Sequence, residues 1–179
     1  MSAISFELLI ILLLFVANGL FAMTEMAMVS SRKSRLRLLA EGGNRGARAA
    51  LKLADEPNRF LPSVQVGITL VGLLAGAFGG ATLAREIAKL LTPMPVLAPY
   101  ADAIGMGMVV VTLTFFSLVI GELVPKRLAL SNPERIACLM ARSLDALSRL
   151  ARPAIWLLGV ATDAVLFLLC VKPKAQSEV

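Results

Sequence analysis

Histidine is absent from this 179-residue chain, and there are only two cysteines, one tryptophan and one tyrosine. Without histidine there is no Ser-His-Asp triad, no histidine zinc site and no imidazole proton shuttle. Cys138 and Cys170 form neither a zinc spacing nor a disulfide framework. Because no nucleophile–base pair stands out, the sequence predicts that the protein is not an enzyme. So few aromatic rings also exclude a stacking platform for single-stranded nucleic acid.

Charged residues are scarce as well. They make up 17% of the chain, whereas 58% of the residues are hydrophobic. Soluble domains carry about 25% charged residues on average, so this composition excludes an ordinary soluble domain and a disordered one. The net charge is +6, but the positive residues share the chain with long apolar runs. That combination argues against nucleic acid as a partner.

Three apolar runs are long enough to cross a hydrocarbon core of about 30 Å as helices. They predict spans at about residues 4–30, 60–84 and 103–123. A cleaved signal peptide is the alternative for the first run, but no Lys or Arg precedes it and no small-residue cleavage pattern interrupts it. A fourth apolar stretch, 154–171, carries Asp163 near its middle. That acid favours a helix at the membrane interface over a fourth span.

Basic residues gather in two segments between these runs. Eight lie within 31–59 and six within 126–152, fourteen of the 18 in all. The positive-inside rule therefore predicts that both segments are cytoplasmic, with the N-terminus outside and the C-terminus inside. Arg85 and Lys89, on the predicted outer side, are a mild exception. The excess charge is expected to lie beside anionic lipid headgroups.

Both basic segments have helical patterns. A turn-forming stretch at residues 41–46 divides 31–59 into two short helices, which predicts a cytoplasmic hairpin. Asn132 is a good N-cap and Pro133 a good first helical residue. Apolar residues then recur three and four apart, which predicts an amphipathic belt helix over 132–171. The predicted fold class is all-α integral membrane, with three transmembrane helices, a cytoplasmic helical hairpin and this belt helix.

Polar side chains inside the predicted spans need an explanation, because polarity is costly in hydrocarbon. Small residues in the second run are most simply explained by close helix packing, and most membrane hydroxyls bond a carbonyl one turn back. Glu25 and Glu122, at the inner ends of two spans, could pair with Arg32 or Lys126. The sharper hypothesis is an intramembrane site of carboxylate, hydroxyl, amide and freed carbonyl oxygens, the ligands of a hard cation such as Mg²⁺. Its candidate ligands are Asn18, Thr24, Glu25, Gln65, Thr69, Gly121 and Glu122.

Three segments resemble a known family in order and spacing. They are Leu20-Phe-Ala-Met-Thr-Glu-Met-Ala-Met-Val-Ser-Ser-Arg, Gln65-Val-Gly-Ile-Thr-Leu-Val-Gly-Leu-Leu-Ala-Gly and Gly121-Glu-Leu-Val-Pro-Lys-Arg-Leu-Ala-Leu. With them the chain resembles the transmembrane domain of the CNNM/CorC family, bacterial hemolysin-C-like branch. The resemblance covers nearly the whole chain and implies a domain over residues 1–171. Residues 172–179 then look like the start of a linker to cytoplasmic domains.

The resemblance implies a homodimer in the bacterial inner membrane that exports Mg²⁺, in some members coupled to Na⁺ entry. It also implies cytoplasmic CBS domains in the full-length protein. Glu122 matches the family's acid in the third helix, and Glu25 matches an acid of the first helix in many bacterial members. However, the family's site serine falls at Ala22, with the hydroxyl displaced to Thr24, and its site asparagine falls at Gly72.

Two hypotheses for the function follow. The first is a divalent cation transport domain that holds Mg²⁺ between Glu122, Glu25 and neighbouring oxygens. The second is a non-transporting membrane anchor or Mg²⁺-sensing module for CBS domains, favoured by the two missing ligands. A pore-forming cytolysin would need an export signal and a soluble mature form, and the sequence offers neither.

Overall fold

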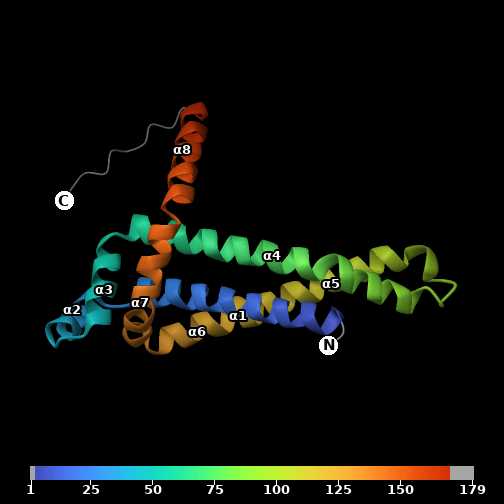
Figure 1. Cartoon of the computed structure of the whole chain (residues 1–179), viewed down its shortest axis with the longest axis horizontal. Helices are drawn as coiled ribbons and strands as arrows, with labels where there is room; N and C mark the ends of the chain where they lie inside the picture. The colour runs from blue at the N-terminus through green and yellow to red at the C-terminus, as the bar shows by residue number, and fades with distance from the viewer. Residues whose placement is uncertain (1–2, 170–179) are drawn as a thin grey trace.

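The computed structural model describes residues 3–169, with side chains for 4–56, 60–162 and 164–169. The described residues form helices and no strand, which confirms the predicted all-α class. Three helical paths are long and apolar enough to cross a membrane: Ile4–Ser30, Phe60–Leu91 and Ala98–Ser131. They lie side by side along the long axis of the molecule (Figure 1).

The three long paths differ in regularity. The first is α1 (Ala3–Ser30) and the second is α4 (Pro57–Leu91). The third begins with the short 3-10 turn η1 (Ala98–Tyr100), continues as α5 (Ala101–Leu118), passes through the π-helical turn η2 (Val119–Leu123) and ends as α6 (Val124–Ser131).

The second and third helices run beyond the spans expected at 60–84 and 103–123. At the end of α4, the Lys89 ammonium lies 2.6 Å from the Glu86 carboxylate, and the Thr92 hydroxyl donates to the carbonyl of Ala88 at 2.8 Å. These local bonds let the helix continue past its apolar run. The third path continues through Pro125 because η2 absorbs the proline instead of ending the helix.

The predicted hairpin is present as α2 (Lys33–Glu41) and α3 (Arg45–Asp55). Gly43, in the turn, has a φ of +89°, a conformation that glycine adopts without strain. Asn44 caps α3, since its side-chain oxygen accepts from the backbone N–H groups of Gly46 at 2.8 Å and Ala47 at 3.1 Å.

The expected belt region is two helices, α7 (Pro133–Leu150) and α8 (Arg152–Leu168), bent by 64° at their junction. Pro153 explains the break, because it lacks an N–H and restricts the residue before it. Asn132 occupies the N-cap position of α7 but makes no side-chain capping bond. The expected end of the belt at 170–171 and the expected linker 172–179 lie outside the described residues.

The main buried core lies where the C-terminal end of α1 meets α3, α4 and α7. Leu36, Val64 and Ala137 are fully enclosed there, and the hydroxyls of Ser63 and Ser148 bond each other at 2.9 Å. Along the spans, by contrast, many large apolar side chains point outward, such as Leu13 and Phe115, each 60% exposed. Lipid is the environment that such faces need.

Candidate functional site

The site begins with a missing hydrogen-bond donor. In an α-helix the carbonyl of Gly121 would accept from the N–H of residue 125, but that residue is a proline. The chain responds with one π-helical turn, in which the N–H of Val124 bonds the carbonyl of Val119. The helix therefore stays continuous, with a π-helical turn at Gly121-Glu-x-x-Pro.

Asn18 of α1 supplies the missing donor. Its side-chain Nδ2 donates to the carbonyl oxygen of Gly121 at 3.2 Å, across 103 residues of sequence. The missing side chain of Gly121 makes room for this approach, because a Cβ there would lie 3.0 Å from the same Nδ2, and the Asn18 side chain would have to shift. The Asn18 residue is only 8% exposed, and its Oδ1 is buried without a hydrogen-bond partner. A free buried oxygen beside η2 is thus available to a further ligand.

Glu122 follows directly in η2 and forms an ion pair. Its Oε1 lies 2.6 Å from the Nζ of Lys126, one turn further along, with the two side chains 42% and 28% exposed. Of the pairings considered from the sequence, the structure therefore selects Lys126 for Glu122. Glu25 is half-buried on α1 and forms no ion pair within the described part of the chain.

The other predicted ligands are not gathered around η2. The Thr24 hydroxyl is buried and donates to the carbonyl of Leu20 at 2.6 Å, the self-bonding expected of a membrane hydroxyl. Gln65 and Thr69 are exposed on α4 and hydrogen-bond to no other described residue. The structure thus brings together Asn18, Gly121 and, next in the chain, Glu122.

Two hydroxyls of α5, those of Thr114 and Ser117, do not make the bond to a carbonyl one turn back that most membrane hydroxyls make. They form no hydrogen bond to any described residue. They line a cavity of about 210 Å³ between α1, α4 and α5, together with Gly72 and Gly76. A Cβ at Gly72 would meet nothing within 4 Å, so a side chain there would extend into open space. That these two hydroxyl oxygens face a shared cavity follows from the packing of α4 against α5 and could not be predicted from the sequence.

Carboxylates are few at this site. Among the side chains that the structure describes, no group of three or more acidic or cysteine residues is placed to hold a metal ion. Any cation held near η2 would therefore depend on one carboxylate, Glu122, and on amide, hydroxyl and backbone oxygens. Such a mixed oxygen set suits a hard cation that keeps part of its water shell.

We predict that Asn18→Leu destabilises the domain by about 1–3 kcal/mol, because it leaves the Gly121 carbonyl buried without a donor. Thermal unfolding of the purified protein in detergent measures this. Thr24→Val is the matched control on the same helix, since its hydroxyl bonds only its own helix and its removal should be nearly neutral. An equal loss in both variants would contradict the role given to Asn18.

The fold and this site define a class: a multi-pass helical membrane domain whose third span carries a π-helical turn beside an acidic side chain. The family model described as "Cyclin M transmembrane N-terminal domain" (CNNM) matches residues 8–179. The chain belongs to the CNNM family, as the resemblance of its three motifs indicated. Membership points to a transport-related role or a membrane module and not to an enzyme.

Relatives of the chain belong to the UPF0053 proteins. It is 51% identical over 178 residues to UPF0053 protein sll0260 of Synechocystis, covering 99% of this chain and 40% of that protein. It is 32% identical to UPF0053 protein YhdP of Bacillus subtilis, over 86% of this chain and 34% of that protein. UPF0053 inner membrane protein YfjD of Escherichia coli is also 32% identical, over 87% of this chain and 33% of that protein. The chain thus spans well under half the length of these relatives.

Proposed function

We propose that this domain transports Mg²⁺ across the membrane through an ion site at η2. The observation that carries the proposal is the buried, unpartnered Oδ1 of Asn18, held beside η2 by the bond from its own Nδ2 to Gly121. Glu122 adds the negative charge that a dehydrating Mg²⁺ requires. The hydroxyls of Thr114 and Ser117 are further oxygens within the same bundle.

Lys126 gives this site a resting state. Its ammonium lies 2.6 Å from the Glu122 carboxylate, in the place that a bound cation would take. An arriving Mg²⁺ must therefore displace Lys126, and release of the ion would let the pair form again. Glu25, Gln65 and Thr69 stay in the proposal as ligands only after the helices move, because no bond links them to η2 in this structure.

The proposal includes a membrane, an orientation, an oligomeric state and a driving force. We place the domain in a bacterial inner membrane; the Escherichia coli relative YfjD is itself named an inner membrane protein. The basic segments face the cytoplasm, the N-terminus lies outside, and two copies form the working dimer. Na⁺ entry is proposed as a driving force for Mg²⁺ export.

A second function is supported by a specific observation. Glu122 is already neutralised by Lys126, and the family's site positions at Ala22 and Gly72 carry no side-chain oxygen. A domain with this arrangement could anchor cytoplasmic CBS domains and sense Mg²⁺ without passing it through the membrane.

Flux measurements on the purified chain in proteoliposomes separate the two functions. A dye for Mg²⁺ inside the vesicles should report uptake down a Mg²⁺ gradient well above that of protein-free vesicles. Parallel gradients of Ca²⁺, Mn²⁺ and Na⁺ test selectivity, and an opposing Na⁺ gradient tests coupling. If calorimetry detects Mg²⁺ binding but no gradient produces flux, the transport function is wrong and the anchor or sensor function takes its place.

A further inference from the structure

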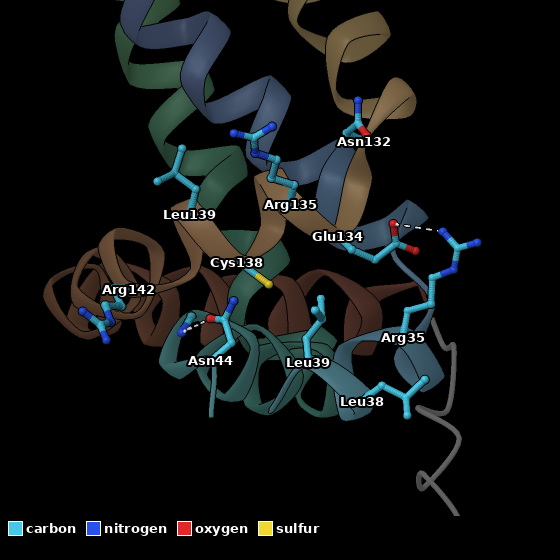
Figure 2. A pocket seen from close by; sticks show the side chains of 11 residues that line it. Arg35, Leu38, Leu39, Asn44, Asn132, Glu134, Arg135, Cys138, Leu139 and Arg142 are labelled. Carbon is cyan, nitrogen blue, oxygen red and sulfur yellow. Dashed lines mark hydrogen bonds and ion pairs between the residues drawn. The ribbon is translucent and has the colours of Figure 1, made fainter. Parts of the chain in front are cut away.

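A further cavity in the described part of the chain is separate from η2. It measures about 820 Å³ and lies between the hairpin α2–α3 and the first half of α7 (Figure 2). Its walls carry three arginines, two from α7 and one from α2, with three leucines among them. The proposed Mg²⁺ site uses none of these residues.

The arginines leave the cavity with excess positive charge. Arg35 is the partner of Glu134, at 3.8 Å, and Glu134 is the lining carboxylate. The guanidinium groups of Arg135 and Arg142 form no hydrogen bond or ion pair with any side chain that the structure describes, and Figure 2 shows them at different ends of the cavity wall. Each unpaired guanidinium group is a separate contact for an anion, and its forked donors match the oxygens of a phosphate group.

The thiol of Cys138 lies at the centre of this cavity and adds no negative charge to it (Figure 2). Burial raises the pKa of the thiol, and the nearby Glu134 carboxylate raises it further. The thiol is therefore protonated at neutral pH, and the positive charge of the arginines is not offset from within.

The apolar part of the wall indicates what kind of anion fits. Leu38, Leu39 and Leu139 line the same cavity and are 69%, 41% and 71% exposed. A small water-soluble phosphate would leave these leucines in water. An amphiphile with a phosphate group and hydrocarbon would cover both parts of the wall.

The cavity lies at a place in the fold where phospholipids are available as ligands. Arg35 follows the end of α1 by five residues, and Asn132, also in the wall, directly follows the third path. Figure 1 shows α7 running across the ends of the three long helices. The cavity therefore lies at the level of the lipid headgroups, whichever side of the membrane this end faces.

We propose that this cavity is a binding site for an anionic phospholipid. Arg135 or Arg142 holds the phosphate, and the three leucines contact the glycerol and the first acyl carbons. Arg35 orients Glu134 away from the anion. A lipid bound here bridges α7 and the hairpin, so it would hold the cytoplasmic helices against each other.

Native mass spectrometry of the purified chain tests this proposal. We expect phosphatidylglycerol to remain bound where phosphatidylcholine does not, and Arg135→Gln with Arg142→Gln to lower the bound fraction roughly tenfold. Arg37→Gln with Arg127→Gln is the matched control, since it removes the same charge from exposed residues outside the cavity wall. The control should change binding less than twofold. Size-exclusion profiles verify that both double variants fold.

A second arm separates the lipid from a free phosphate ester. Leu139→Ser should weaken phosphatidylglycerol binding but not the weak binding of glycerol phosphate. Equal losses in the cavity and control variants would overturn the proposal in favour of diffuse attraction to a charged surface. Glycerol phosphate binding as tightly as the lipid would overturn the assignment of a phospholipid.

Discussion

Glu122→Gln should reduce Mg²⁺ flux through the reconstituted domain to the level of protein-free vesicles. The substitution keeps the size of the side chain and removes the one carboxylate in η2. Mg²⁺ gives up its water reluctantly, so amide and hydroxyl dipoles alone cannot offset the cost of dehydration. We therefore expect a loss of transport rather than a graded decrease.

The Glu122→Gln experiment needs two further variants, because the substitution also leaves the ammonium of Lys126 without its partner. Adding Lys126→Gln removes that stranded charge, and the double variant should be folded and equally inactive. Glu86→Gln is the matched control: Glu86 forms the same kind of 2.6 Å pair with Lys89, near the other end of the spans. Flux that survives in a folded Glu122 variant would refute the assignment of this residue.

Gly46→Val should be the most destabilising single substitution in the hairpin α2–α3, at about 3 kcal/mol, or a fall in Tm of roughly 6–12 °C. A Cβ at Gly46 would overlap the carbonyl oxygen of Cys138 and lie 3.0 Å from its carbon. Both are backbone atoms of α7, so no side chain can turn away to make room. This close contact between α3 and α7 also holds Ala47, Ala50 and Leu53 of α3 in buried positions.

Gly42→Ala provides the control for Gly46. Gly42 lies in the same hairpin with a φ of −69°, and a Cβ there would be no closer than 3.5 Å to its neighbours. Thermal unfolding in detergent should therefore show little change for this variant. Comparable losses of stability at the two glycines would mean that the hairpin tolerates no added side chain anywhere. The close contact between Gly46 and Cys138 would then not explain the effect of Gly46→Val.

Local patterns predicted most of the fold. Hydrophobic length identified the three spans, and the turn at 41–46 located the hairpin. These features depend on residues close together in the chain, so sequence periodicity is enough to find them. The single belt helix expected over 132–171 was instead two helices, because the effect of Pro153 on the preceding turn outweighed the continuing apolar pattern.

The candidate site was predictable only in part. Glu122, Gly121 and Asn18 were all named from the sequence, because polar residues in apolar runs are conspicuous. The bond between Asn18 and Gly121 was not, since the two residues lie 103 positions apart in the sequence, with all of α4 and α5 between them. Thr114 and Ser117 were passed over because self-bonding is the usual state of membrane hydroxyls.

The sequence by itself determined that this is a helical membrane domain with a proline that deprives its third span of a donor. Length, hydrophobicity and the chemistry of proline are properties of the chain alone. Only the tertiary structure decided that Asn18 replaces that donor, that Lys126 neutralises Glu122, and that two unpaired arginines border one cavity. Those outcomes depend on which helix faces meet, and close packing fixes that choice through atoms far apart in sequence.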